Sequence, residues 1–197
     1  MKKRALFTGM IIVATAITLQ AQTTDDLLRD FAQKVAKAPA VEIEFIWNET
    51  VPGTMVLQGG MFTLKIDEFY VFCNGEKKWY YNQGIDQWEE MPHDKNSPDI
   101  LENPSAFFAR LNQDYYHGGT PLRKESATGN TLWELTLVPN SIESPFTYVI
   151  IALTADSLKP LYIRYALADG TQYPVTISSF RTGPARPAGF FLPDFSR

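Results

Sequence analysis

Apolar and polar residues alternate over short runs through most of this chain, and aromatic residues are densest between residues 62 and 91. Turn-forming residues divide this stretch at Asn74-Gly75 and at Asn82-Gln83-Gly84. Asparagine and glycine tolerate positive φ, so Asn-Gly between apolar runs indicates a hairpin. The pattern predicts three or four short antiparallel strands in a strongly curved sheet, with aromatic residues at Phe62, Phe69, Tyr70, Phe72, Trp79, Tyr80, Tyr81 and Trp88.

Two more alternating segments precede this stretch. Residues 41–47 place apolar side chains at every second position, with Glu42 and Glu44 between them, which is typical of a half-buried strand. Residues 55–66 also alternate, and Gly59-Gly60 interrupts them, which predicts a bulge or a sharp bend. Bends of this kind let a sheet curl toward a barrel.

Residues 25–37 predict an amphipathic helix ahead of the sheet. Leu28, Phe31 and Val35 recur at helical spacing, and acidic residues at the start suit the positive end of a helix. The polar face carries no net charge, whereas a helix that lies on a membrane surface is usually basic. We therefore expect this helix to pack on the protein's own sheet.

The alternation of apolar and polar residues ends after residue 91. Residues 92–105 are polar and rich in proline, and both Ser97-Pro98-Asp99 and Asn103-Pro104-Ser105 resemble helix starts. The second start leads into an apolar helical face, which must be covered, formed by Phe107, Phe108 and Leu111. We interpret the segment as short helices inserted into one domain, because strand patterning resumes at about residue 131.

The remaining strands lie between residues 131 and 181, where Asp169-Gly170 predicts a further hairpin. The proline- and glycine-rich tail ends in aromatic residues and is expected to wrap the surface. The fold class predicted from these elements is α+β. It is an incomplete, strongly curved antiparallel β-barrel, covered by one N-terminal helix and by short inserted helices.

Residues 1–21 have the pattern of a secretory signal peptide. Three basic residues precede an apolar run, and Ala21 suits the position before a cleavage site. The alternative is an uncleaved anchor, but the run is shorter than the roughly 20 residues that a spanning helix needs. Residues 22–197 are then expected to be one exported domain. Because the leader contains three cations and no acids, its loss makes the net charge more negative than −4. An acidic chain is a poor binder of nucleic acids.

Candidate catalytic groups are sparse, and we predict neither an enzyme nor a cofactor. The chain contains two histidines, His93 and His117, without a further ligand at metal-binding spacing. Cys73 is the single cysteine and is expected to be buried, so no internal disulfide can form. No nucleophile or phosphate-loop motif is present. The carboxylates near residues 89–102 are expected to face solvent.

Because candidate catalytic groups are sparse, the apolar and aromatic residues of the strands are the candidates for a ligand site. Their alternation predicts that one set of side chains projects toward a concave apolar space: Trp47, Phe62, Leu64, Trp79, Tyr81 and Trp133. The helical face of Phe107, Phe108 and Leu111 is predicted to be its lid. Composition leaves two alternatives, a space filled by its own side chains or a cavity for an apolar ligand.

Several short motifs resemble the outer-membrane lipoprotein carrier (LolA-like) family of the Gram-negative periplasm. Asn74-Gly75 followed by Trp79 and Tyr81 is similar to that family's hairpin, and Asn103-Pro104 with Phe107-Phe108 resembles its mid-chain helix. Further along, the chain is similar to the family at the turn Asp156–Pro160, at Asp169-Gly170 and at Phe190–Pro193. The resemblance covers nearly all of residues 22–197 and is of the type found in Bacteroidetes.

The resemblance implies a periplasmic chaperone that holds lipoprotein acyl chains in an apolar cavity. It would receive them from an inner-membrane lipoprotein-releasing ABC transporter and pass them to the outer membrane, as a monomer, through an acceptor that the sequence does not identify. The family often has a Pro-x-x-Phe-Arg segment whose arginine helps to hold the lid shut, whereas this chain has residues 65–69, Lys-Ile-Asp-Glu-Phe. The alternative function is an interaction or sensor domain with a filled core.

Overall fold

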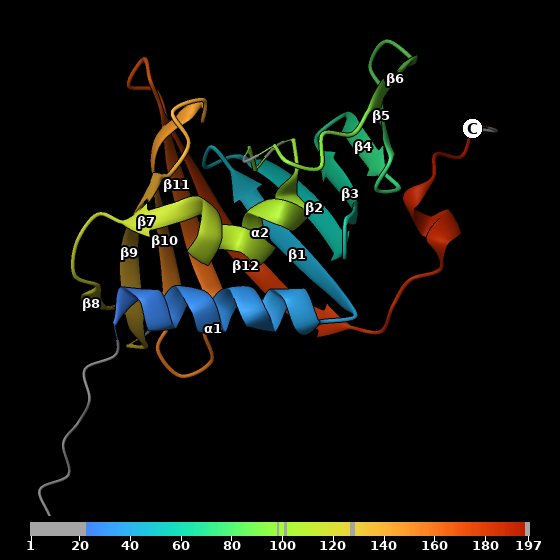
Figure 1. The fold of residues 1–197 in the computed structure, drawn as a ribbon. Helices are drawn as coiled ribbons and strands as arrows, with labels where there is room; N and C mark the ends of the chain where they lie inside the picture. Colours follow the sequence, from blue (N-terminus) through green and yellow to red (C-terminus); the bar gives the residue numbers. More distant parts are fainter. Residues whose placement is uncertain (1–22, 98, 101, 127–128, 196–197) are drawn as a thin grey trace, which may run out of the picture.

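The computed structural model describes residues 23–97, 99–100, 102–126 and 129–195. Within them, twelve strands form one curved antiparallel sheet, in the order β6-β5-β4-β3-β2-β1-β12-β11-β10-β9-β7, with β8 beside β9 (Figure 1). The predicted signal peptide, residues 1–21, lies outside the described residues. In the described part of the chain, no helix is long and apolar enough to cross a membrane.

The strands have the following bounds: β1 Ala40–Trp47, β2 Val51–Gln58, β3 Met61–Ile66, β4 Phe69–Cys73, β5 Lys77–Asn82, β6 Gln87–Pro92, β7 Tyr115–His117, β8 Leu122–Glu125, β9 Thr131–Pro139, β10 Phe146–Thr154, β11 Pro160–Leu167 and β12 Gln172–Gly183. The predicted curved, incomplete barrel is confirmed, because β6 and β9 with its short partners end the sheet without pairing with each other. Gly59-Gly60 forms the tight turn between β2 and β3, where Gln58 pairs with Met61, and is not a bulge within one strand.

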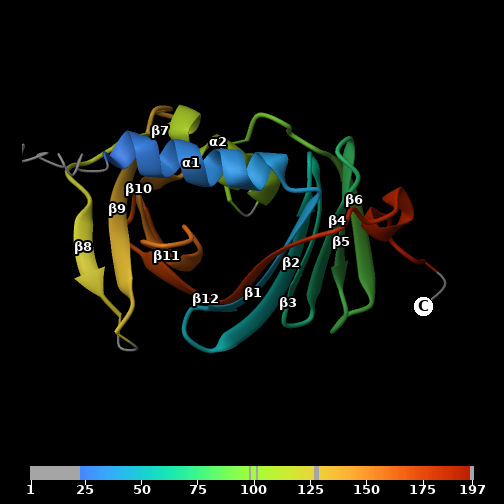
Figure 2. The same cartoon turned by 90° about the horizontal axis from the view of Figure 1, so that it is seen from below.

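The two halves of the sheet meet at β1 and β12. These strands pair from Ala40 with Gly183 to Trp47 with Val175, and the register shifts once, after Glu44. A shift of this kind marks a β-bulge, which bends the strand and increases its twist. The sheet is therefore a trough, and both helices lie on its concave side (Figure 2).

Helix α1, Thr24–Lys37, begins where the sequence predicts it. The Thr23 side chain accepts a hydrogen bond from the Asp26 amide, and acidic residues occupy the first turn. The expectation that α1 packs on the protein's own sheet is confirmed, because its apolar face is buried at Leu27, Leu28, Phe31, Ala32 and Val35. The Phe31 ring contacts Phe180 of β12 and Phe108 of the second helix, which ties α1 to both layers.

Helix α2, Pro104–Asp114, is capped by Asn103, whose side chain accepts from the Ala106 amide. The helix start predicted at Ser97 does not form, because Ser97, Asp99 and Ile100 lie in turns or irregular backbone. The Asn103 side chain also donates to the carbonyls of residues 94 and 95, so it holds the preceding segment as a compact turn.

The C-terminal tail wraps the sheet from outside, as expected. The Gln58 side chain binds the Arg186 backbone through both of its polar atoms, at 3.0 and 2.6 Å. A short 3₁₀ helix, η1 (Ala188–Phe191), then lies against β3 and buries Phe191. Phe195 completes this contact by packing on Trp88 of β6, with ring centroids 5.0 Å apart.

Replacing Gly53 tests how tightly the middle of the trough is packed. Phe45 lies opposite Gly53 in the β1–β2 register, and its buried ring covers the glycine so closely that an added Cβ would overlap it. Gly53→Ala should therefore lower the free energy of unfolding by about 1–3 kcal/mol through overpacking. The control Gly60→Ala, where nothing lies within 4 Å of the added atom, should change it by less than about 0.5 kcal/mol. Urea denaturation measures both, and equal losses would contradict this packing.

Candidate functional site

The concave face carries an apolar cavity of about 30 Å³ below α2. Its floor comes from the inward positions of β1, β2, β3, β11 and β12, and its roof is formed by the segment before α2 and by α2 itself. The lining residues are Ile43, Phe45, Trp47, Met55, Leu64, Ile66, Ile100, Phe108, Ile163, Tyr165, Val175 and Ile177. A cavity with such a lining favours an apolar occupant over water.

The two polar groups of this lining bind each other. Trp47 Nε1 donates to the Tyr165 hydroxyl at 3.0 Å, and Tyr173 stacks on both rings, with centroids 5.7 Å from Trp47 and 5.2 Å from Tyr165. Burial is the main reason that the pKa of Tyr165 is raised to about 12. The hydroxyl therefore stays neutral, and the cavity wall carries no charge.

The cavity is small. A space of about 30 Å³ lies far below the roughly 300–1,000 Å³ of a typical ligand pocket. Ile100 and Phe108 line its roof, and their exposed fractions are 6% and 2%. A space of this size holds no acyl chain unless side chains of the lining move.

The structure brings three of the sequence-predicted residues together at this cavity: Trp47, Leu64 and Phe108. Phe62 points to the same face but is fully buried beyond the cavity, against His93. Trp133 lies on the inward-facing side of β9. It is half-buried and packs against the core, but it does not line the cavity. The other two lid residues, Phe107 and Leu111, are buried in the core instead of lining the cavity.

Trp79 and Tyr81 lie on the opposite, convex face, which corrects their assignment to the concave space. Cys73 pairs with Phe62 on one side and with Lys78 on the other, and residues that pair in an antiparallel ladder point to the same face. The turn after Cys73 therefore turns the even-numbered residues of β5 inward. Its length sets the phase, and alternation within one strand does not reveal it.

On the convex face, the two residues bind different partners on β6. Trp79 Nε1 donates to Glu90 at 2.7 Å, and the Tyr81 ring stacks on Trp88 at 4.4 Å. The hairpin motif by which the chain resembles the carrier family thus stabilises the outside of the sheet.

The sequence reasoning missed the contribution of the C-terminal half to the floor. Ile163, Tyr165, Val175 and Ile177 lie on β11 and β12, and they meet the β1 residues because β12 pairs with β1. The alternation of these residues along β11 and β12 indicated that each strand has a buried face. The alternation does not show that this face is shared with β1.

Lys78 is the buried cation of the concave face and binds the segment that precedes α2. Its side chain is 2% exposed, and its ammonium forms an ion pair with Glu102, whose side chain is 45% exposed. Burial by itself lowers the pKa of Lys78, but the bonds to Glu102 and Tyr80 outweigh burial and raise it. Lys78 therefore remains charged, and its partner lies immediately before the Asn103 cap of α2. We name this ion pair the latch.

His93 lies beside the latch and is almost fully buried. Its Nδ1 has no hydrogen-bond partner among the described residues, and its ring packs edge-on against Phe62 at 5.8 Å. Burial first and the nearby Lys78 ammonium second lower the pKa of His93 below 6.5. The imidazole is therefore neutral at pH 7 and contributes to packing.

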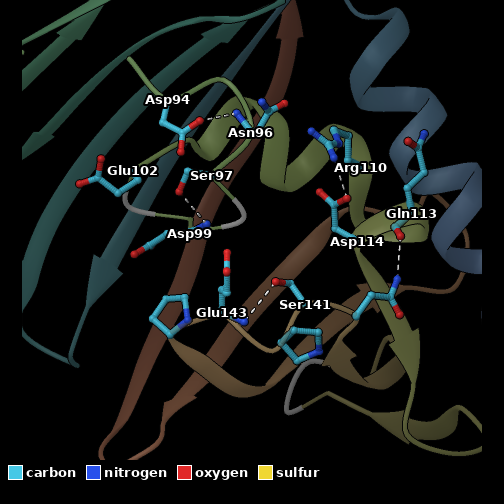
Figure 3. A pocket seen from close by; sticks show the side chains of 13 residues that line it. Asp94, Asn96, Ser97, Asp99, Glu102, Arg110, Gln113, Asp114, Ser141 and Glu143 are labelled. Atoms are coloured by element: carbon cyan, nitrogen blue, oxygen red, sulfur yellow. Dashed lines mark hydrogen bonds and ion pairs between the residues drawn. The ribbon is translucent and has the colours of Figure 1, made fainter. Parts of the chain in front are cut away.

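A polar pocket of about 530 Å³ lies on the other side of the segment before α2 (Figure 3). Its charged lining comprises five carboxylates and one arginine: Asp94, Asp99, Glu102, Asp114, Glu143 and Arg110. Arg110 is bound to Asp114 at 2.8 Å. The pocket is therefore strongly negative, and it shares Glu102 with the latch.

The described residues contain no group of three or more His, Cys, Asp or Glu placed to hold a metal ion. His117 lies 3.8 Å from Asp25 with both side chains largely exposed, far along the chain from His93. The cavity on the concave face offers a small apolar space.

No protein-family model matches the chain, and no curated protein sequence matches it. Solved structures do match it. A conserved protein of Thermus thermophilus, described as uncharacterized, has a TM-score of 0.56 at 10% identity, with 86% of this chain and 94% of that one covered. A DUF1329 family protein from Desulfovibrio piger has a TM-score of 0.50 at 9% identity, with 85% and 95% covered.

The matching structures include a LolA superfamily protein from Nitrosomonas europaea, at a TM-score of 0.41 and 12% identity, with 85% of this chain and 97% of that one covered. The fold assignment rests on the two structures with higher TM-scores, and identities this low establish the fold alone. The expected Bacteroidetes lineage gains no support from them.

Replacing each partner of the latch in turn distinguishes the loss of the counter-charge from the loss of the buried ammonium. Glu102→Gln leaves the Lys78 ammonium buried without a counter-charge, which should lower the free energy of unfolding by about 1–3 kcal/mol. Lys78→Met replaces the ammonium by an apolar side chain and should cost less, because apolar replacements of buried ions are well tolerated. In both variants, hydrogen exchange at the amides of α2 should accelerate by a larger factor than exchange in β1 and β12, which should follow only the loss of global stability. Unaltered exchange in α2 would show that the ion pair does not restrain the helix.

Proposed function

We propose that this protein is a periplasmic carrier that holds an acyl chain on the concave face of its sheet and delivers lipoproteins from the inner to the outer membrane. The observation that carries the proposal is the small apolar cavity between the sheet and α2. Five strands and a helical cover present apolar side chains to one space, and its two polar groups satisfy each other.

The cover can move without breaking the sheet. Turns and irregular backbone precede α2, and the three-residue strand β7 follows it, so its displacement leaves the ladders from β6 to β9 paired. Displacement would remove Phe108 from Phe31, with which it packs edge-on at 6.3 Å. An acyl chain entering behind it gains about 0.8 kcal/mol for each buried CH₂ group, and so offsets the contacts that the cover loses.

In this opening, the ion pair between Lys78 and Glu102 has to break. The carrier family uses an arginine to hold its lid, and residues 65–69 of this chain contain none. Lys78 connects the sheet to the root of α2 and is placed to take a comparable part. In the proposed cycle, an inner-membrane ABC transporter supplies the lipoprotein, and the monomeric carrier needs no catalysis and no cofactor.

A second candidate function is an interaction or sensor domain with a filled core. The small size of the cavity, about 30 Å³, favours it. The two candidates differ in what the concave face does when an apolar ligand is present. A carrier opens and exchanges its own side chains for the ligand, whereas an interaction domain keeps its core and uses its surface.

Tryptophan fluorescence tests whether the concave face binds an acyl chain. Trp47 lines the cavity, while Trp88 lies on the convex face. A fatty acid brominated along its chain should quench the fluorescence saturably, because the bromine would lie beside the Trp47 indole. A chain that buries about ten CH₂ groups has up to about 8 kcal/mol available, so micromolar dissociation constants are expected.

The matched variants locate the quenching. Trp47→Phe should remove most of it, and Trp88→Phe should leave it in place. Quenching that is absent, that does not saturate, or that survives Trp47→Phe would contradict an acyl site on the concave face and would favour the interaction domain.

Depletion in the source bacterium tests the cargo. If the protein carries lipoproteins, its loss should leave them at the inner membrane, because their acyl chains cannot cross an aqueous compartment unprotected. Fractionation of the two membranes, with immunoblots for lipoproteins, measures this. Complementation with the Trp88→Phe variant is the control for expression. Normal sorting after depletion, with no second protein of this fold in the same cell, would exclude the lipoprotein carrier and leave another apolar ligand or a partner protein.

A further inference from the structure

The concave face continues beyond the part that α2 covers. A groove of about 370 Å³ lies over the hairpins at the β6 end of the sheet. Its residues come from β4, β5, β6, the β5–β6 turn and the segment before α2. Its concave-face residues and those of the turn and the segment before α2 are Phe69, Tyr80, Asn82, Ile85, Gln87, Glu89, Met91 and Glu102.

The groove and the cavity are neighbours on one surface. Ile66 lines the cavity, and its partner across the β3–β4 ladder is Phe69, which lines the groove. Both side chains therefore point to the concave face, side by side. Glu102 lines the groove and is the exposed partner of the latch, so the groove adjoins the ion pair that precedes α2.

The groove has a mixed chemistry that the cavity lacks. Phe69 and Ile85 are 56% and 65% exposed, although both are large apolar residues. Between them, the amide side chains of Asn82 and Gln87 lie opposite each other in the β5–β6 ladder. Apolar side chains that alternate with amides suit a polypeptide better than a plain hydrocarbon chain, because a peptide backbone needs hydrogen-bond partners.

The charge of the groove is negative. Glu89 and Glu102 line it, and no lysine or arginine stands among its described lining residues. The polar pocket on the other side of the segment before α2 adds Asp94 and Asp99. Such a surface attracts cations and repels carboxylates and phosphates.

Strand β6 supplies a further feature. It is the last strand of the sheet on this side, so one edge of its backbone pairs with no other strand within the described residues. An extended peptide can pair with such an edge while its side chains occupy neighbouring pockets.

We propose that this groove binds the polypeptide segment next to the acyl chain of the cargo, and that it prefers a segment with lysine or arginine. The inference rests on the proposed function, because the acyl chain in the cavity brings the segment to the groove. The groove is then the part of the site that distinguishes one lipidated protein from another. The cavity, with its uniform apolar wall, binds any acyl chain.

Competition for the bound brominated fatty acid tests the groove with three probes that share one palmitoyl chain. They are palmitate, a short palmitoylated peptide with two lysines, and the same peptide with two glutamates in place of the lysines. At low ionic strength, the lysine peptide should bind about five-fold more tightly than the glutamate peptide, as expected for exposed ion pairs. Glu89→Lys should abolish or reverse this preference and leave palmitate binding unchanged.

Two controls confine the effect to the groove. Glu143→Lys makes the same charge change in the polar pocket and should keep the preference for the lysine peptide. Ile85→Ser should weaken both peptides equally without affecting palmitate, whereas Ile142→Ser, at a fully exposed isoleucine outside the groove, should affect no probe.

The outcomes separate the two proposals. If palmitate binds but both peptides bind equally, or if Glu143→Lys removes the preference and Glu89→Lys does not, the groove inference is overturned and the acyl carrier stands. If none of the three probes competes and the fatty acid itself does not bind, the carrier proposal fails, and the groove inference fails with it.

Discussion

The pairing of β1 with β12 is the contact on which the rest of the structure depends. It joins residues near the two ends of the described chain, from Ala40 with Gly183 to Trp47 with Val175, and so makes one sheet from two halves. Each half alone would be a meander with an exposed apolar face, too small to enclose anything. Joined and bent, they form a trough whose concave side must be covered from water, and α1 and α2 provide that cover.

The two helices cover the trough differently. Helix α1 is capped and buries a whole apolar stripe, with Phe31 against β12. Helix α2 packs mainly on α1 and touches the strands little, and its root is held by the ion pair of Glu102 with Lys78. A buried ammonium is costly when its partner leaves, so the latch favours the closed state. In the proposed carrier, an acyl chain that replaces Phe108 on the sheet would restore the lost apolar contact, and the open and closed states would then be close in free energy.

The two polar spaces at the mouth of the trough are both negatively charged. The groove over β4–β6 and the polar pocket beside α2 are both lined by carboxylates, and they share Glu102. The interior holds one buried cation, Lys78, and one buried neutral imidazole, His93, whose pKa is lowered by burial. The apolar floor offers no selectivity among hydrocarbon chains. Any discrimination between ligands therefore has to come from the charged rim.

The sequence by itself determined the features that local physics encodes. The spacing of Leu28, Phe31 and Val35 specified α1, the turn at Asn74-Gly75 ended β4, and Asn103-Pro104 started α2, because period, cap and turn chemistry act over a few residues. Strand alternation also marked Trp47 and Leu64 as inward-facing. The same local rules suggested a helix start at Ser97. It does not form, because hydrogen bonds from the Asn103 side chain hold that segment as a turn.

Only the tertiary structure decided how these faces combine. Trp79 and Tyr81 point outward because the turn after Cys73 pairs it with Lys78, and a shift of one residue in that register would have turned them inward. The floor contributed by Ile163 and Val175 depends on a pairing between distant strands, as does the latch between Lys78 and Glu102. The cavity is small, and its roof consists of Ile100 and Phe108, which meet residues of five strands there. Such contacts depend on register and on long-range packing, and no periodicity within a single segment encodes either.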